Sequence, residues 1–438
     1  MTVSIINRLS TEQENFAESY NRLLHWDAGD QAQIESAVAN IIADVKSRGD
    51  EAVIDYTSRF DKIDLKPQTM AFTKDEITSA IAKCSKEELS ALALATERIK
   101  SYHEWQLPKM GVDTYHDASG TKLGQRVLPL QSAGLYVPGG LASYPSSVLM
   151  NAIPAKVAGV KELIMVVPTP NGVVNPLILA AADAVGVDAV FKVGGAQAVA
   201  AMTFGTDTIP SVDKIVGPGN IYVATAKRQV FGRVGIDMIA GPSEIFIVAD
   251  KDNDPNWLAA DLLSQAEHDE IAQSILVTDS QELADAVEVA LAAQLKVLSR
   301  RDICKKALAD RGAIIVTKDI AEACSLASQA ASEHLELAVA DPEALLPQIQ
   351  NAGAIFLGRY TPEPIGDYVA GPNHVLPTEG TARFSSPLGV FDFIKRTSLI
   401  HCSPASFAKI APAASQLAES EGLTAHKLSV DLRLESIS

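Results

Sequence analysis

The sequence between residues 133 and 243 alternates short apolar runs with helical patterns, and this repeat constrains the fold more than any other feature. The runs GLYVPGG, ELIMVVPTP, AVFKVGG and DKIVGPGN end in loops rich in glycine or proline, and a segment with helical spacing follows each of them. Repeated strand–helix units of this length require a parallel sheet with helical crossovers. The same alternation of apolar runs and helical segments returns in SILVTDS, GAIIVTKD, LELAVAD and GAIFLG. The sequence therefore predicts an α/β protein with two parallel-sheet units.

The rest of the chain is predicted to be mainly helical. Residues 10–130 have a helical pattern, in which the apolar residues between Gln31 and Arg48 recur at helical spacing and Gly49 ends the segment. Further helices are expected at about 255–273, 281–299, 319–331 and 342–350. The tail from Phe407 is alanine-rich and helical, so we expect a small C-terminal unit beyond the two sheets.

Composition and charge exclude several classes of function. The formal net charge is −17, which disfavours phosphate backbones and anionic lipid surfaces because like charges repel. The start of the chain lacks the pattern of a secretory signal, and no apolar run reaches the roughly 18 residues of a membrane span. The four cysteines lie far apart without a CxxC pair, which is typical of reduced thiols. We therefore expect a cytoplasmic enzyme that binds neither nucleic acid nor membranes.

Three glycine loops, VPGG, VGGAQ and VGPGN, follow the carboxyl ends of predicted strands. Ligands bind along that edge of an open parallel sheet, and glycines let backbone N–H groups approach a ligand closely. None of the loops matches GxGxxG, so the standard dinucleotide-binding fingerprint is absent. For each loop alone a simple tight turn stays the alternative, but three loops on one edge favour binding.

Two histidine-containing motifs can supply metal-binding or catalytic groups. Gln265 and His268 are three residues apart in a predicted helix, so one face can present an amide oxygen and an imidazole nitrogen to a zinc ion. Glu333 and His334 lie where a helix ends and a strand begins. Histidine is the natural general base near neutral pH, and a glutamate can activate water. Taken alone, each motif is more often structural than functional.

Two later segments carry further candidates. Asp367 lies in a loop enforced by prolines and a glycine, where it can act as a hard oxygen ligand, and His374 lies in a rigid turn that suits binding. Near the C-terminus Glu421 and His426 flank Gly422, which is expected to break the alanine-rich helix, although such pairs are ordinarily surface residues. The chain has no HExxH or GxSxG motif and no zinc-finger spacing, so those hydrolase and zinc-finger signatures are missing.

Taken together and in this order, the motifs resemble histidinol dehydrogenase. The most specific block is GPNHVLPTEGTARFSSPLGVFDFIKRTSLI, and SQAEHD, SEHLEL, VGGAQAVAAMTFGT, VGPGN, AGPSE and EGLTAHKLSV support it. The matching segments run from about Gly134 to the C-terminal tail, which is about three-quarters of the chain. The combination of motifs, rather than any one of them, carries the resemblance.

The resemblance implies a role for each matching residue. One zinc ion per subunit would be held by Gln265, His268, Asp367 and His426, and the catalytic pair would be Glu333 and His334. The NAD contacts would be Tyr136, Gln197 and Asn220. The substrate contacts would be Ser243, His374 and Glu421, together with the zinc ligands and His334. Members of this family are intertwined homodimers with shared active sites, so Glu421 and His426 would come from a second copy of the chain.

The resemblance also implies a domain plan with two Rossmann-like sheets. Residues 1–30 would form an N-terminal helical arm, and residues 31–132 with 244–385 a first α/β domain that carries the catalytic and most metal-binding residues. Residues 133–243 would form a second, Rossmann-like domain on the NAD side, and residues 386–438 a tail domain that contributes to the partner's site.

The implied reaction is the NAD-dependent, four-electron oxidation of L-histidinol through L-histidinal to L-histidine, the last steps of histidine biosynthesis. His334 would take a proton in both oxidations, and Glu333 would activate the water that hydrates the aldehyde. Three alternatives stay open: a two-lobed solute-binding protein, a zinc hydrolase without NAD, and a sister zinc- and NAD-dependent dehydrogenase that oxidises another primary alcohol to an acid.

Overall fold

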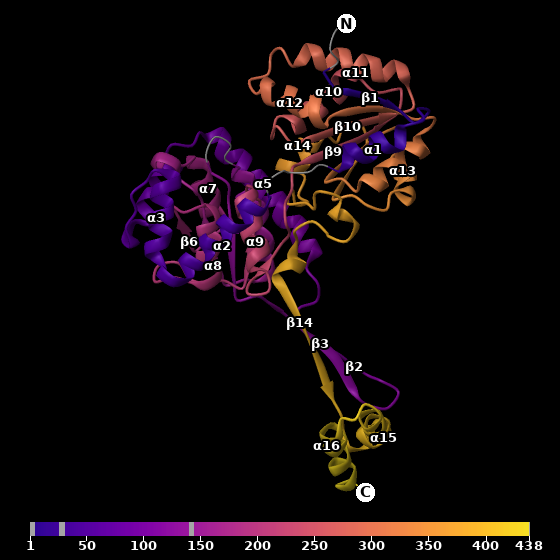
Figure 1. Cartoon of the computed structure of the whole chain (residues 1–438). Helices are drawn as coiled ribbons and strands as arrows, with labels where there is room; N and C mark the ends of the chain where they lie inside the picture. The colour runs from indigo at the N-terminus through magenta and orange to yellow at the C-terminus, as the bar shows by residue number, and fades with distance from the viewer. Residues whose placement is uncertain (1–4, 26–30, 140–143, 438) are drawn as a thin grey trace.

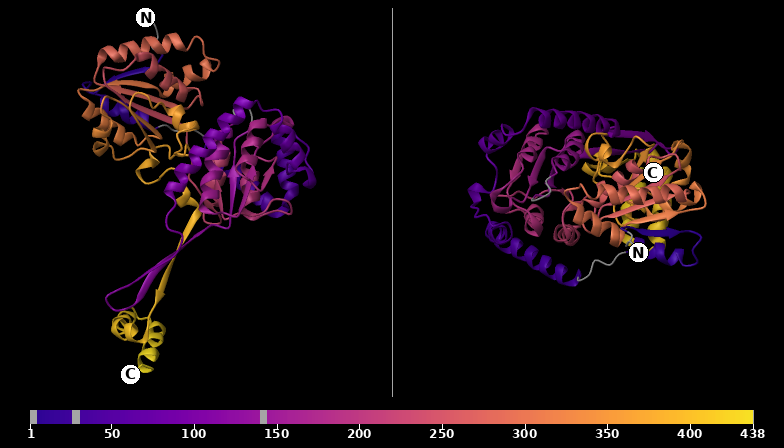
Figure 2. Two further views of the ribbon diagram at one scale, coloured as in Figure 1. Left: turned by 180° about the vertical axis from the view of Figure 1, so that it is seen from behind. Right: turned by 90° about the horizontal axis from the view of Figure 1, so that it is seen from above.

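The computed structural model describes residues 5–25, 31–139 and 144–437, with the side chain of residue 31 left out. The chain forms two α/β lobes and a long projecting arm, as Figures 1 and 2 show. None of the helices in these ranges is long and apolar enough to cross a membrane. Each lobe is built on a parallel sheet, which confirms the α/β fold expected from the alternating pattern.

The first lobe contains a six-stranded parallel sheet with the order β1-β11-β10-β9-β12-β13. Its strands are β1 (Asn7–Ser10), β9 (Glu244–Ala249), β10 (Gln273–Thr278), β11 (Ala313–Val316), β12 (His334–Ala338) and β13 (Ala354–Leu357). Helices α10 (Pro255–Ala266), α11 (Gln281–Gln294) and α12 (Arg301–Arg311) pack on one face, and α1 (Phe16–Leu24) and α13 (Ile320–Ala330) on the other. Strands β9, β10 and β12 are buried along their whole length, as expected for parallel strands covered on both faces.

The second lobe contains a five-stranded parallel sheet with the order β6-β5-β4-β7-β8. Its strands are β4 (Ser132–Tyr136), β5 (Glu162–Val166), β6 (Ala189–Phe191), β7 (Lys214–Val216) and β8 (Gly235–Ile236). Helices α4 (Lys74–Ile81), α5 (Lys86–Gln106), α6 (Pro145–Ala158) and α7 (Pro176–Ala184) cover one face. Helices α2 (Gln31–Arg48), α3 (Asp50–Asp61), α8 (Gly195–Phe204) and α9 (Ile221–Val230) cover the other.

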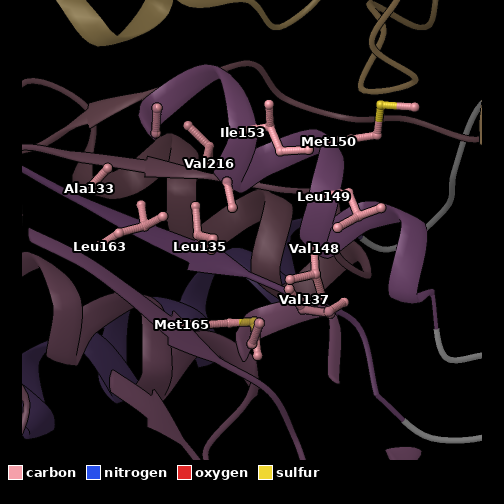
Figure 3. Packing of buried hydrophobic residues seen from close by; sticks show 14 of the residues in the cluster. Ala133, Leu135, Val137, Val148, Leu149, Met150, Ile153, Leu163, Met165 and Val216 are labelled. Carbon is pink, nitrogen blue, oxygen red and sulfur yellow. The ribbon is translucent and has the colours of Figure 1, made fainter. Parts of the chain in front are cut away.

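One core of this second lobe lies between its sheet and helix α6, and another lies on the opposite face of the sheet. Figure 3 shows Leu135 and Leu163 on neighbouring strands beside Val148 and Ile153 of α6. Counted from β9 in the first lobe and from β4 in the second, both sheets add two strands on one side and then two on the other, which is the Rossmann order, and β1 extends the first sheet at its edge. A ligand crevice is therefore expected at the carboxyl ends of β4 and β7, where the strand order reverses.

The arm is an antiparallel sheet with the order β14-β3-β2, followed by a helical hairpin. Its strands are β2 (Gly111–His116), β3 (Lys122–Pro129) and β14 (Ile394–His401), and its helices are α15 (Pro404–Ser420) and α16 (Thr424–Glu435). In Figure 1 the hairpin lies at the far end of the arm, away from both lobes. Leu417, Leu423, Leu428 and Leu432 are exposed apolar side chains on or between these two helices.

The remaining short elements are α14 (Glu363–Tyr368) and the 3₁₀ turns η1 (Pro67–Thr69), η2 (Pro170–Gly172), η3 (Glu343–Gln348), η4 (Thr381–Arg383) and η5 (Val390–Phe393). The helix expected at 342–350 is the 3₁₀ turn η3, which contains Pro347. Strands β2 and β3 lie inside the region 10–130 that was expected to be mostly helical. Because β2 is exposed along nearly its whole length, it lacks the alternation that marks a half-buried strand.

The packing of the N-terminal and C-terminal segments differs from the domain plan drawn from the sequence. Residues 31–132 were grouped with 244–385, but α2–α5 pack on the helices of the five-stranded sheet. The arm expected at residues 1–30 contains β1, an edge strand of the six-stranded sheet. The tail unit was expected to begin at residue 386, yet Leu388 and Phe393 are buried in the core of the second lobe. Apolar residues at helical spacing show that one face of a helix is buried, but they do not show which sheet that face packs against.

Candidate active site

The candidate catalytic residues lie at the amino ends of strands β9 and β12, where the first lobe meets the second. His334 is the first residue of β12 and pairs in register with Ile245, the second residue of β9. Two contacts join the lobes here: the ring of Tyr144 stacks on that of His268 with centroids 6.4 Å apart, and Ser147 Oγ lies 3.1 Å from His374 Nε2. The site is therefore an inter-lobe site.

Glu333 and His334 form a buried carboxylate–imidazole pair. They are 7% and 2% exposed, and Glu333 Oε2 lies 3.7 Å from His334 Nδ1. The Nδ1–H group of His334 donates to the backbone carbonyl of Glu244 at 2.9 Å. Because a carbonyl oxygen only accepts hydrogen bonds, the proton must be on Nδ1, and Nε2 is left to exchange protons with a ligand. This pairing of Glu333 with His334 agrees with the expectation from the sequence.

Burial and neighbouring charges move the pKa values of this pair in the same direction. Burial raises the pKa of the Glu333 carboxyl to about 8, although His334 opposes the shift. Burial also disfavours the charged form of His334, but the carboxylates of Glu333, Glu363 and Asp367 outweigh it and hold the pKa of the imidazole well above its ordinary value. Perturbed pKa values of this kind cluster at functional sites.

A candidate metal cluster adjoins the pair. His268, Glu363 and Asp367 each offer one ligand atom within 4.8 Å of the others. Oδ1 of Asp367 lies 3.5 Å from Nε2 of His334, and Nε2 of His268 lies 4.0 Å from Oε1 of Glu363. Imidazole nitrogens and carboxylate oxygens are donors that zinc accepts. The cluster thus unites two of the four predicted ligands.

The side chain of Gln265 provides an independent test of whether these residues fit a cation. It is fully buried, and neither its Oε1 nor its Nε2 has a hydrogen-bond partner among the described residues. A buried amide without a partner is costly, so an unpaired oxygen one turn before His268 fits a metal ligand. Helix α10 ends at Ala266 rather than continuing through His268, and the N–H of His268 donates to the carbonyl of Gln265 at 3.1 Å.

Glu363 is a candidate functional residue that the sequence analysis missed. Its carboxyl is buried beside the predicted ligands, and its Oε2 accepts a hydrogen bond from Ser264 Oγ at 3.2 Å. Burial raises the pKa of this carboxyl to about 7, against the influence of His334. The available signal was its position: Glu363 and Asp367 are four residues apart, and helix α14 places such residues on one face.

His374 and Ser243 lie at the edge of this site. Nδ1–H of His374 donates to the backbone carbonyl of Asp367 at 2.9 Å, and the Ser147 hydroxyl is the partner of its Nε2. Both ring nitrogens thus have protein partners, and the ring links the two lobes. Ser243 immediately precedes β9, and its carbonyl accepts from the N–H of Gln273 at 2.9 Å.

The predicted NAD residues lie at the carboxyl edge of the five-stranded sheet. Tyr136 ends β4, and its buried hydroxyl accepts a hydrogen bond from the N–H of Gly195 at 3.1 Å. Gln197 is buried on α8, and its Oε1 has no partner among the described residues. Asn220 caps α9 by accepting from the N–H groups of Tyr222 and Val223. Helix N-termini at such an edge favour anionic ligands.

The VGPGN loop is held by buried charges. Gly217 has φ +114°, and a Cβ at this position would overlap the carbonyl oxygen of Tyr136, so only glycine fits. Its carbonyl accepts from Lys227 Nζ at 2.9 Å, its N–H donates to Asp237 Oδ2 at 2.7 Å, and Lys227 and Asp237 form a buried ion pair. The loop therefore has one defined shape. Gly140 of the VPGG loop lies outside the described residues.

Within one chain, the structure does not bring Glu421 and His426 to this site. Glu421 caps α15 and His426 lies in the first turn of α16, both exposed. Their hairpin is at the far end of the arm in both Figure 1 and Figure 2. Any role of these residues in a site therefore requires the tail of another copy of the chain.

The fold and the site together define the class of protein. One Rossmann-like sheet carries glycine loops at its carboxyl edge, the other carries a buried acid–base pair and a metal-type cluster at its amino edge, and Tyr144 and Ser147 of one lobe contact His268 and His374 of this site. This combination is expected of an α/β enzyme that binds a ligand along the glycine loops and has an acid–base pair beside a cluster able to hold a cation.

Comparisons with known proteins agree with this class and identify the family. The family model described as histidinol dehydrogenase matches residues 25–434. The chain is 58% identical over 430 residues to the histidinol dehydrogenase of Cereibacter sphaeroides, covering 98% of this chain and 99% of that protein. It is 57% identical over 428 residues to that of Rhodospirillum rubrum, covering 98% of each.

A solved structure has the same fold over the whole chain. The crystal structure of histidinol dehydrogenase from Elizabethkingia anophelis superimposes with a TM-score of 0.93 at 36% identity, and the match covers 100% of both chains. The chain therefore belongs to the histidinol dehydrogenase family. The family expected from the motifs is confirmed, and the solute-binding and hydrolase alternatives are disfavoured.

Proposed function

We propose that the chain catalyses the NAD-dependent oxidation of L-histidinol, through L-histidinal, to L-histidine, as an oxidoreductase of histidine biosynthesis in the cytoplasm. One observation carries the proposal: the buried Glu333–His334 pair adjoins the His268–Glu363–Asp367 cluster, with 3.5 Å between His334 Nε2 and Asp367 Oδ1. An acid–base pair beside a cation site suits an alcohol whose neighbouring nitrogens bind the cation. Membership of the family supports this substrate.

The residues that would hold the zinc ion are Gln265, His268 and Asp367, with His426 from a second copy of the chain. The unpaired amide of Gln265 and the proximity of His268 to Asp367 support this set. When bound, zinc orients the amine and imidazole of the substrate and adds Lewis-acid assistance. The further substrate contacts that we propose are Ser243 and His374 of the same chain and Glu421 of the second copy.

When bound, NAD⁺ would supply the hydride acceptor for each of the two oxidations. We propose that it binds along the glycine loops through Tyr136, Gln197 and Asn220. The buried Oε1 of Gln197, which has no partner within residues 5–25, 31–139 and 144–437, supports this placement, because a ligand donor would satisfy it. The N-terminus of α9, behind the Gly217 loop, is suited to a phosphate.

The chain's own residues account for the proton transfers. A cation held by His268 and Asp367 would offset the carboxylates that raise the pKa of His334, and Nε2 of the neutral imidazole then takes the alcohol proton as histidinol becomes the aldehyde. Glu333 takes a proton from the water molecule that adds to the aldehyde carbon, and His334 returns its proton to the aldehyde oxygen, so that the hydrate forms and His334 is neutral again. His334 then takes a proton from the hydrate as the second oxidation gives the carboxylic acid. Because the pair is buried, the aldehyde stays away from amines in solvent.

We propose that the active sites are shared within a homodimer. The arm extends away from its own lobes and ends in a hairpin with exposed Leu417, Leu423, Leu428 and Leu432. Exposed apolar residues gathered on one unit favour an interface. If the hairpin of each copy lies against the other copy's lobes, Glu421 and His426 can reach the cluster of the partner.

The stoichiometry of NADH formation tests the proposed function directly. We expect about two NADH per L-histidinol, since each of the two oxidations transfers one hydride. Removal of the metal with a chelator should abolish both oxidations, and added zinc should restore both, because the metal positions the substrate. Stopped absorbance assays at 340 nm measure the yield. One NADH per substrate, or turnover that survives metal removal, would contradict the proposal, and a panel of primary alcohols separates histidinol from a sister substrate.

The variant Glu333→Gln tests the assignment of water activation. Glutamine fills the same volume but cannot accept a proton, so the aldehyde-to-acid step should slow by about 10²-fold, the lower range for general base catalysis. The alcohol step should slow by less than about 10-fold, because His334 serves it. Single-turnover NADH formation from L-histidinol and from L-histidinal measures the two steps separately. Equal slowing of both steps would remove Glu333 from this role.

A further inference from the structure

Glu244 connects to both members of the catalytic pair, although no role has been assigned to it. It is the last residue of the AGPSE motif and the first residue of β9, and it is buried. Its backbone N–H donates to Glu333 Oε2 at 2.9 Å, and its backbone carbonyl accepts from His334 Nδ1 at 2.9 Å. A single residue therefore orients the carboxylate and selects the tautomer of the imidazole.

The side chain of Glu244 holds that backbone in place from two sides. Its Oε2 accepts from the N–H of Glu333 at 3.4 Å, and its Oε1 accepts from the N–H of Glu379 at 3.1 Å. The two oxygens thus bridge the start of β12 and the loop at residues 378–380. Arg311 lies close enough to stabilise the carboxylates of both Glu244 and Glu379 by charge attraction.

The surrounding loop has little room to move. Gly241 N–H donates to Thr378 Oγ1 at 2.6 Å, and a Cβ on Gly241 would lie 2.5 Å from the side chain of Glu379. A Cβ on Gly353 would lie 2.5 Å from the carbonyl oxygen of Glu333. Close packing of this kind transmits a shift of Glu244 directly to the catalytic pair.

We propose that Glu244 is a positioning residue for the reaction: its carboxylate fixes the start of β9, whose peptide groups hold His334 in the Nδ1–H tautomer and aim Glu333 at the water. The inference rests on the proposed function, because it presumes that Glu333 and His334 do the chemistry. Residues that orient a reacting group through hydrogen bonds are typically worth about 10- to 100-fold in activity.

The variant Glu244→Gln tests this role. Both carboxylate oxygens accept from backbone N–H groups, so the amide of glutamine must turn its NH₂ group toward one of them and displace it. We expect kcat to fall by about 10- to 100-fold, while KM for L-histidinol and bound zinc stay within about 2-fold. Steady-state kinetics and metal analysis on the full-length enzyme measure these quantities. Glu244→Asp retains the charge opposite Arg311 and is expected to fold, with a smaller fall in kcat.

Ile245→Val is the matched control, because Ile245 is the next residue of β9, equally buried, and packs in the core of the first lobe. It should lower thermal stability and leave kcat within about 2-fold. An unchanged kcat in Glu244→Gln and Glu244→Asp would overturn the inference, as would a fall in kcat that tracks loss of zinc or of stability. If His334→Asn retains turnover, the proposed catalytic pair fails; if His334→Asn is inactive and the Glu244 variants are normal, only this inference fails.

Discussion

Replacing His334 with asparagine is expected to lower the rates of both oxidation steps by about 10²–10⁴-fold, the usual contribution of a general base. Asparagine can still donate a hydrogen bond to the Glu244 carbonyl, which lies 2.9 Å from His334 Nδ1, so the start of β12 should keep its shape. What the variant loses is Nε2, the nitrogen on the side of Asp367. Steady-state and single-turnover NADH formation measure the effect, and bound zinc should stay close to one per subunit.

The control for that experiment is a second buried histidine. His103 on α5 is fully buried, and its Nδ1 is hydrogen-bonded to Gln106 Oε1 at 2.8 Å, in the second lobe and outside the site. His103→Asn changes a buried imidazole in the same way and should leave kcat within about 2-fold, whatever it does to stability. Near-normal turnover in His334→Asn would reject His334 as the base.

Mixing two inactive chains is expected to restore activity if the sites are shared. His426→Asn should lose zinc and activity, since it removes one proposed ligand. In a heterodimer of His426→Asn with His334→Asn, one shared site carries both changes and the other carries neither. A purified heterodimer should therefore have about half the activity of the unaltered dimer.

Two differently tagged chains, co-expressed and isolated by sequential affinity steps, provide the heterodimer for this test. The matched control pairs His334→Asn with Glu333→Gln, which lie on the same chain segment, so that in the heterodimer each site carries one of the two changes. That heterodimer should show no recovery of activity. An inactive His334→Asn/His426→Asn heterodimer would show that the tail acts within its own chain, whereas full zinc content in His426→Asn would show that His426 is no ligand.

Much of the fold could be predicted from the sequence, because buried parallel strands read as continuous apolar runs. Strands β10 and β12 have no exposed residue, and the apolar runs SILVTDS and LELAVAD that contain them predicted both strands, whereas β9 is equally buried but was not predicted. Strands β2 and β14, by contrast, are mostly exposed, and their sequences lack that signal. The arm that they form was therefore missed.

The candidate site was only partly predictable for the same physical reason. Gln265, His268 and the Glu333–His334 pair were identified because their local patterns, taken with the resemblance of the whole, marked them. Glu244 was missed because a single glutamate has no local signature, and Glu363 was missed because the segment around Asp367 was expected to be a loop rather than the helix α14. What distinguishes them is burial beside other polar groups, which only the packing of distant segments creates.

The amino-acid order alone determined two parallel sheets and the glycine-rich turns at one edge of the second, because these depend on the spacing of side chains along a strand or a helix. Only the tertiary structure decided that helices α2–α5 cover the second sheet, that Glu244, Glu333 and His334 meet at the amino edge of β9 and β12, and that the tail lies far from the lobes of its own chain. Those outcomes depend on contacts between segments hundreds of residues apart, which no local pattern encodes.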